Sequence, residues 1–114
     1  MNENKEIWKD IKGFEGHYQV SNFGRVKSIK FRKERILKPA NNGCGYLYVN
    51  LSKNGKYNIY LIHRLVALIF ISNPNNLPEI NHRDEDKTNN KVENLEWCDR
   101  KYNMNYGTRT QRQS

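Results

Sequence analysis

The chain has 114 residues, of which 36% are hydrophobic and 28% charged, a balance that fits one small folded domain or two very small modules and excludes a disordered chain. Twenty Lys and Arg against twelve Asp and Glu leave a formal net charge of +8, which favours nucleic acid as the partner over a merely basic, solvated surface. Cys44 and Cys98 form no C-x-x-C pair and the longest apolar stretch, residues 65–71, is too short for a bilayer, so we expect a cytoplasmic protein with reduced cysteines and no membrane contact.

The first third of the chain predicts a small antiparallel sheet. Residues 18–20 and 25–29 have strand-like composition on either side of the turn residues 21–24. Other short strand-like pieces, broken by turn residues, extend from residue 7 to about residue 39. The charge-rich stretch of residues 30–38 marks the expected join between this sheet and the next module.

A hairpin and a buried helix are predicted in the middle of the chain. Residues 45–51 alternate between apolar and polar side chains, and Asn54-Gly55 supplies a favoured tight turn before a returning strand at residues 57–62. The next residues, 63–71, are too apolar for a surface helix. They suit a short helix packed under a sheet.

The last third predicts two short strands and a helix. The strands, residues 79–82 and 94–98, flank a polar loop. Asp99 can cap a helical segment that runs through Asn103. Residues 106–114 are polar, basic and without periodicity, so we expect a basic tail there.

The segment from residue 79 to residue 105 concentrates side chains that can bind a metal or move a proton. The order strand, loop, strand, helix would bring Asn81 and His82 to face Asn103. Hard oxygen ligands suit Mg²⁺ or Mn²⁺ better than zinc, and a neutral imidazole can take a proton from water. The polar side chains concerned are Asn81, His82, Asp84, Asp86, Asn89, Asn90, Asn94 and Asn103.

Two motifs in this segment, Ile80-Asn81-His82-Arg83-Asp84 and Asn94-Leu95-Glu96-Trp97, resemble those of the HNH endonucleases, whose nuclease centre is a ββα-metal (His-Me) finger. Residues 61–67 are similar to the helix that precedes the finger in phage versions. Residues 8–22 and 24–26 resemble the small nuclease-associated module of phage intron-encoded nicking homing endonucleases. Because these motifs follow one another in the family's order, the resemblance covers nearly the whole chain.

The resemblance implies a role for each matching residue. His82 matches the family's general base, Asn94 the residue that braces the loop between the two strands, and Asn103 the metal ligand on the helix. Asn81 occupies the remaining ligand position, where the phage homing enzymes carry Asp. A neutral amide should hold the cation more weakly than a carboxylate does.

The resemblance also implies an α+β fold, with a small N-terminal antiparallel sheet followed by a ββα-metal finger. The expected modules are residues 1–55 and 56–105, followed by the tail at residues 106–114. The implied function is hydrolysis of phosphodiester bonds in double-stranded DNA, with one divalent cation, Mg²⁺ or Mn²⁺, and His82 as general base. One active centre cuts one strand per visit, so we expect nicking by a monomer or weak dimer in a bacterial or phage-infected cell.

Two other functions stay open from the sequence. The weakened metal position also suits a non-catalytic DNA-binding module with a vestigial site, and an RNase is a further alternative. The intact His82 weighs against the first alternative. The resemblance to a duplex-binding module weighs against the second.

Basic and histidine side chains outside the finger are candidate DNA contacts. The basic residues alternate with strand residues and can neutralise phosphates without reading bases, although a solvated face is the simpler interpretation. His63 opens the apolar helix, where a packed or capping histidine is the ordinary interpretation and a DNA-contacting or supporting role the functional one. The candidates are Arg25, Lys27, Arg32, Lys33, Arg35 and His63.

Overall fold

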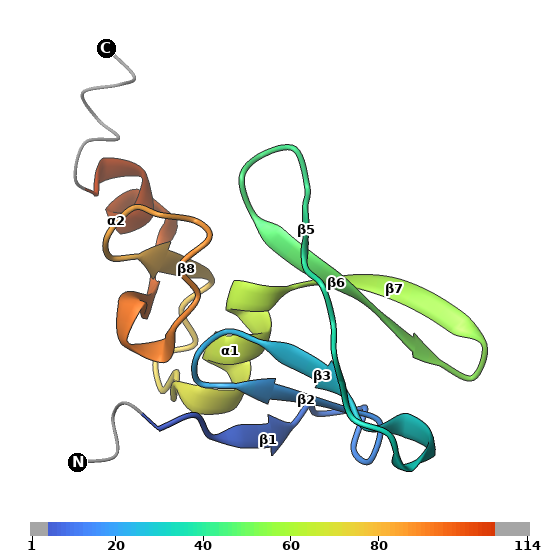
Figure 1. Cartoon of the computed structure of the whole chain (residues 1–114). Coiled ribbons are helices and arrows are strands. Elements are labelled where there is room, and N and C mark those ends of the chain that lie inside the picture. Colours follow the sequence, from blue (N-terminus) through green and yellow to red (C-terminus); the bar gives the residue numbers. More distant parts are fainter. Residues whose placement is uncertain (1–4, 107–114) are drawn as a thin grey trace.

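A computed structural model describes residues 5–106 of the chain, which form three antiparallel sheets and two α-helices (Figure 1). The first sheet has the order β1-β2-β3-β4, with β1 at Trp8–Asp10, β2 at Tyr18–Ser21, β3 at Val26–Ser28 and β4 at Arg35–Ile36. Neighbouring strands in it are antiparallel. The small N-terminal antiparallel sheet predicted from the sequence is confirmed.

The turn between β2 and β3 is set by Ser21 and Gly24. The Ser21 hydroxyl oxygen accepts hydrogen bonds from the backbone N–H groups of Phe23 (3.1 Å) and Arg25 (3.2 Å). Gly24 has a φ of 86°, which favours glycine, and a Cβ there would lie 2.8 Å from the carbonyl oxygen of Asn90. The first sheet therefore packs directly against the backbone at residue 90, far along the chain.

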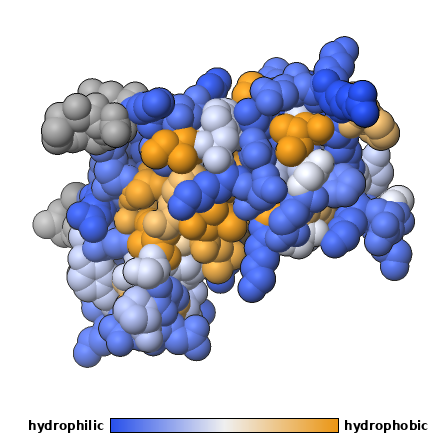
Figure 2. Space-filling model, turned by 90° about the horizontal axis from the view of Figure 1, so that it is seen from below, coloured by the Kyte–Doolittle hydropathy of each residue, from blue (hydrophilic) through white to orange (hydrophobic). Residues whose placement is uncertain are grey.

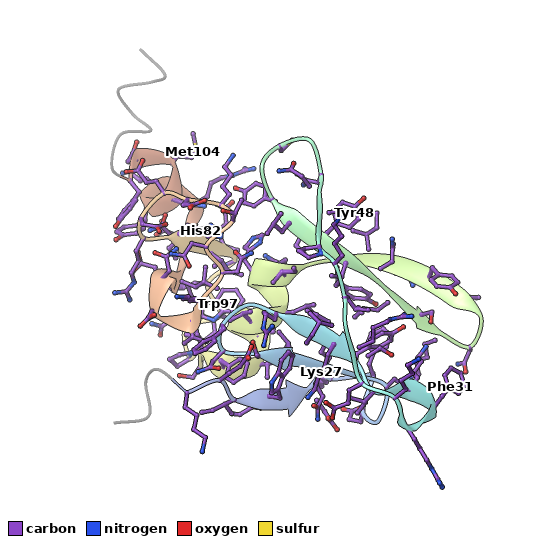
Figure 3. All side chains as sticks on the ribbon, in the orientation of Figure 1. Lys27, Phe31, Tyr48, His82, Trp97 and Met104 are labelled. Atoms are coloured by element: carbon purple, nitrogen blue, oxygen red, sulfur yellow. The ribbon has the colours of Figure 1, made fainter. Side chains whose placement is uncertain are left out.

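The chain leaves the first sheet near the end of residues 30–38, the stretch expected as a join between modules, because β4 ends at Ile36 and the first strand of the second sheet begins at Ala40. A 3₁₀ turn, Lys30–Arg32, leads into β4, which pairs with β3. Phe31 in this turn is 93% exposed and lies at the opposite end of the molecule from His82 (Figure 3). The exact position of β4 is not predicted, because its two exposed residues show no alternation of apolar and polar side chains.

The second sheet contains β5, Ala40–Asn41, β6, Leu47–Lys53, and β7, Lys56–Leu61, with β6 in the middle. Asn54 and Gly55 form the turn between β6 and β7 with positive φ values of 55° and 79°, as the Asn-Gly pair predicts. The expected module boundary between residues 55 and 56 falls inside this turn. The two strands that it separates pair with each other from Tyr48–Leu61 to Lys53–Lys56.

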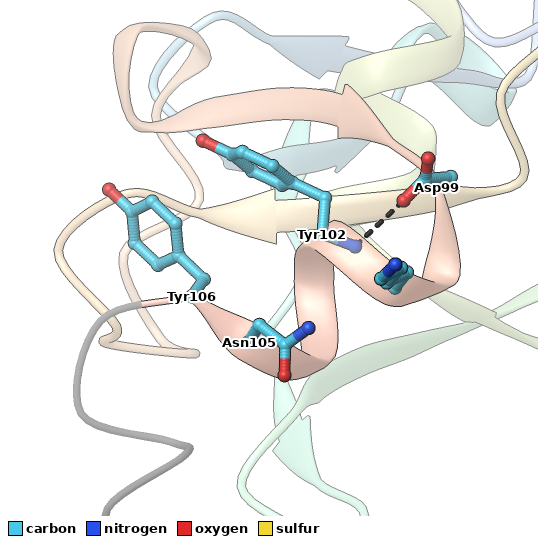
Figure 4. Close-up of a pocket in the computed structure, with 5 residues that line it drawn as sticks. Asp99, Tyr102, Asn105 and Tyr106 are labelled. Carbon is cyan, nitrogen blue, oxygen red and sulfur yellow. Dashed lines mark hydrogen bonds between the residues drawn. The ribbon is translucent and has the colours of Figure 1, made fainter.

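The third sheet is the hairpin of β8, Glu79–His82, and β9, Leu95–Cys98, which the 3₁₀ turn Val92–Asn94 precedes. Helix α2, Arg100–Asn105, follows, and we call residues 79–105 the finger. The Asp99 carboxylate caps α2, because it accepts a hydrogen bond from the backbone N–H of Tyr102 at 2.7 Å (Figure 4). The predicted strand–loop–strand–helix order and the cap are confirmed.

Helix α1, Ile62–Phe70, contacts strands of all three sheets and connects them through one core. Its buried residues Leu65, Val66 and Ala67 belong to a cluster that extends from Ile11 to Leu95. Burial of these side chains supplies the main favourable free energy of folding, so the first sheet and the finger are stabilised together.

The face shown in Figure 2 is mainly hydrophilic, with a large apolar area and smaller apolar areas separated from it. Leu68 of α1 is among the exposed apolar side chains, at 64% exposure. Within residues 5–106, neither α-helix is long and apolar enough to cross a membrane. The tail expected at residues 106–114 lies outside the described residues apart from Tyr106.

Candidate active site

The β8–β9 hairpin directs chemically different side chains to two helices. Consecutive residues of a strand point to opposite faces. His82 lies against His63 of α1, whereas Asn81 contacts Glu96, which also bonds to Tyr102 of α2. The finger therefore has an imidazole face around His82, labelled in Figure 3, and an amide face around Asn81.

His82 is held by Asn90, in the loop between β8 and β9. The His82 ring is 1% exposed, and its Nε2 lies 2.8 Å from Oδ1 of Asn90. A carbonyl oxygen only accepts, so Nε2 donates to it, and in the neutral ring the lone pair is then on Nδ1. Gly24 lets the first sheet pack on the backbone of Asn90, which fixes this partner in place.

His63 and Tyr46 pack around the His82 ring. The ring centroid of His82 lies 5.1 Å from that of His63 and 6.1 Å from that of Tyr46. Burial, together with the nearby charges of His82 and Arg64, lowers the pKa of His63 to about 4, so this ring is neutral at pH 7. His63 is buried and packs against both Tyr46 and His82, a position that suits the supporting role.

Asn94 ties the loop of the hairpin to the start of β9. Its Oδ1 accepts a hydrogen bond from the backbone N–H of Asp84 at 3.0 Å. Its Nδ2 donates to the Asp84 carboxylate at 2.9 Å and to the carbonyl oxygen of Asn89 at 2.8 Å. This is the arrangement that the predicted bracing role requires.

Asn81 is fully buried and faces a carboxylate across the hairpin. Its Nδ2 donates to Oε2 of Glu96, the residue directly opposite in β9, at 2.7 Å. The Tyr102 hydroxyl donates to the same oxygen at 3.2 Å. Burial and the Glu96 charge raise the pKa of Tyr102. A guanidinium nitrogen of Arg83 lies 3.8 Å from the other Glu96 oxygen.

Asn103 of α2 has a similar environment. Its Nδ2 donates to Oε1 of Glu79 at 2.9 Å, and the Nε of Arg100 lies 3.6 Å from the other Glu79 oxygen. The Tyr106 hydroxyl, drawn in Figure 4, holds the end of this helix by donating to the Arg83 carbonyl oxygen at 2.9 Å. The two amides predicted as metal ligands thus lie between the hairpin and α2, each with its nitrogen on a carboxylate.

The donor chemistry of the amide face fits a hard divalent cation. Within residues 5–106, no three His, Cys, Asp or Glu side chains gather into a metal cluster, and the ligands predicted at this face are the oxygens of Asn81 and Asn103. A carboxylate only accepts hydrogen bonds, so the nitrogen of each amide turns toward its glutamate and Oδ1 turns away from it. Amide oxygens are ligands that Mg²⁺ and Mn²⁺ accept.

The predicted DNA contacts differ in how well they are placed for a phosphate. The Arg25 guanidinium is bound to the Glu6 carboxylate. Lys27 is buried and its Nζ lies 3.2 Å from the Glu34 carboxylate. The exposed members of the set are Arg32, Lys33 and Arg35 around the 3₁₀ turn and β4.

Comparison with known proteins gives a consistent result. Residues 6–52 match the NUMOD4 motif. The chain is 45% identical over 97 residues to the DNA endonuclease I-HmuI of Bacillus phage SP01, an alignment that covers 85% of this chain and 55% of that protein. The solved structure of the HNH homing endonuclease I-HmuI aligns with a TM-score of 0.80 and 40% identity over 94% of this chain and 59% of that chain. The chain resembles the HNH homing endonucleases in sequence and in fold.

A second HNH relative comes from a giant virus. An uncharacterised HNH endonuclease of Acanthamoeba polyphaga mimivirus is 45% identical over 94 residues, which cover 82% of this chain and 28% of that protein. The chain thus spans between about a quarter and somewhat over half of these relatives. The HNH resemblance and the nuclease-associated module predicted from the sequence are confirmed.

Three residues of the finger had no specific predicted role. Asn90 was one amide among many in the polar loop, and only the fold shows that it holds His82. Glu79 and Glu96 lie in strands, where charged residues of an alternating pattern usually face solvent. The cross-strand register, which pairs Asn81 with Glu96, would have found one of them.

Proposed function

We propose that the chain is a metal-dependent endonuclease that hydrolyses phosphodiester bonds in double-stranded DNA and nicks one strand at a time. The His82–Asn90 hydrogen bond carries the proposal, because it gives His82 the tautomer of a general base. The I-HmuI relative is named a DNA endonuclease, which supports DNA as the substrate.

His82 would take the proton of the attacking water through Nδ1 while Asn90 holds the protonated Nε2. The water oxygen bonds to phosphorus in line with the 3′ oxygen, whose bond to phosphorus breaks. The imidazole keeps the proton until solvent removes it, and the leaving oxygen is protonated by solvent. The phosphate would lie across the end of β8, between the imidazole face and the amide face.

Asn81 and Asn103 would hold one divalent cation, Mg²⁺ or Mn²⁺, through their Oδ1 atoms. When bound, the cation offsets the negative charge that develops on the phosphate and on the leaving 3′ oxygen. Asn94 acts at a distance from these atoms, because it keeps the loop that contains Asn90 folded against β9.

The formal charge of +8 and the exposed basic side chains of the first sheet support binding to the DNA backbone. One finger has one His82 and cuts one strand per binding event, so we propose a monomer or weak dimer as the acting form. The phage relative supports action inside a bacterial or phage-infected cell.

The test is incubation of the purified protein with supercoiled plasmid, with and without Mg²⁺ or Mn²⁺. Nicked circles should appear only with the cation. His82→Ala should slow nicking by roughly 10²- to 10⁴-fold and leave DNA binding intact, whereas His17→Ala, at an exposed histidine in the turn before β2, should nick at the parental rate. Binding without nicking by the parent would favour a vestigial site, and cleavage of RNA alone would favour an RNase.

A further inference from the structure

The amide face of the finger contains two amide–carboxylate pairs of the same kind. Asn81 on β8 donates to Glu96 on β9 at 2.7 Å, and Asn103 on α2 donates to Glu79 on β8 at 2.9 Å. Each pair joins two different elements of the finger. The pairs therefore fix the orientation of both proposed ligands before any cation binds.

Orientation matters because an amide offers a cation only its oxygen. A glutamate carboxylate accepts from the amide nitrogen, which turns Oδ1 to the opposite side of the group. Residues that hold metal ligands by hydrogen bonds in this way also change the electrostatic environment of the metal. Asn81 is fully buried, so its orientation is held by packing as well as by Glu96.

Charge is the second contribution of the glutamates. Two neutral amides give a dication no opposing charge. In this chain the nearest carboxylate to Asn81 is on the facing strand, at Glu96. Arg83 and Arg100 offset the two glutamates only weakly, because their side chains are 57% and 80% exposed and lie at 3.8 Å and 3.6 Å.

We propose that Glu96 and Glu79 are positioning residues of the cation site: they direct the Asn81 and Asn103 oxygens toward the cation and supply the negative charge that the two amides lack. This inference rests on the proposed function.

The experiment measures Mn²⁺ binding by electron paramagnetic resonance, with and without a DNA duplex, for the parent, Glu96→Gln and Glu79→Gln. Glutamine keeps one oxygen that can accept the amide hydrogen bond and replaces the charged carboxylate with a neutral amide. Each variant should bind Mn²⁺ roughly 10- to 100-fold more weakly and need correspondingly more Mn²⁺ for nicking. Their melting temperatures without metal should stay close to that of the parent. Glu93→Gln, at an exposed acidic residue next to Asn94, is the charge-matched control and should bind like the parent.

The outcomes separate this inference from the function on which it rests. A parent that neither binds Mn²⁺ nor nicks DNA would contradict the proposed function. A parent that does both, together with unchanged Mn²⁺ affinity in Glu96→Gln and Glu79→Gln, would overturn the role of the glutamates alone. Complete loss of Mn²⁺ binding in one variant would also overturn it, because that glutamate would then be a direct ligand.

Discussion

The Nε2 atom of His82 and the Oδ1 atom of Asn90 lie 2.8 Å apart inside the finger, eight residues apart in sequence. The amide oxygen fixes the proton on Nε2, so Nδ1 is the atom that can accept a proton from water. The same loop places Asn90 against Gly24 of the first sheet. The tautomer of the proposed base thus depends on packing between the N-terminal sheet and the finger.

Replacing Asn90 tests this dependence. Asn90→Ala removes the acceptor and should reduce the nicking rate roughly 10- to 100-fold. Asn90→Asp places a carboxylate beside the ring, which favours the charged imidazolium, so the rise of the nicking rate with pH should move up by about one pH unit. Rates measured from pH 5.5 to 9 give both values. Asn89→Ala is the matched control, because the Asn89 side chain donates to Asp84 and not to His82.

His63 should make folding stability fall with acid. Its pKa of about 4 in the folded protein, against 6.5 for an exposed histidine, means that the unfolded chain binds a proton between these pH values and the folded chain does not. The stability contribution is complete above about pH 6.5 and is lost as the pH falls toward 4. Replacement by Phe removes the titration and keeps an aromatic ring against Tyr46.

Urea unfolding at pH 7, 5.5 and 4.5 measures this effect. Between pH 7 and pH 4.5 the parent should lose about 2–3 kcal/mol more unfolding free energy than His63→Phe does. Equal losses in the two proteins would mean that His63 is protonated in the folded state at these pH values, in conflict with its burial beside His82.

The sequence predicts those parts of the molecule in which local chemistry dominates. Alternation and the Asn54-Gly55 pair predict the β6–β7 hairpin, and Asp99 predicts the start of α2. The strand β4 is too short for a periodic signal, so its pairing with β3 depends on the tertiary fold. The role of Asn90 cannot be predicted from the sequence either, because its contact with His82 forms only when the loop folds.

DNA binding should depend on the exposed basic residues of the first sheet. Arg32→Ala, Lys33→Ala and Arg35→Ala combined should lower the slope of log affinity against log salt by up to about 3, since each lost phosphate contact lowers it by about 0.9. Lys27→Met should instead lower stability, because Lys27 is buried beside Glu34. Fluorescence anisotropy from 50 to 300 mM salt gives the slopes.

A control variant with the same loss of charge distinguishes contact from net charge. It combines alanine substitutions at exposed lysines outside the 3₁₀ turn and β4, at Lys5, Lys12 and Lys101. Its slope should stay close to that of the parent. If both triple variants flatten the slope equally, the overall charge governs binding and the first sheet has no special part in it.

Asn81→Asp should have opposite effects with and without a cation. The new carboxylate would take the place of an amide nitrogen that lies 2.7 Å from Glu96, so two carboxylates would oppose each other in a buried position. Without metal, the unfolding free energy should fall by about 1–3 kcal/mol, because the hydrogen bond is lost and like charges are brought together. Saturating Mn²⁺ should raise the melting temperature of Asn81→Asp more than that of the parent, since the cation relieves the repulsion.

Asn81→Asp combined with Glu96→Gln keeps one carboxylate at the site and should regain metal-free stability while binding Mn²⁺ at least as tightly as the parent does. If the double variant is no more stable than Asn81→Asp, the repulsion from Glu96 is absent and Asn81 does not face Glu96 in solution.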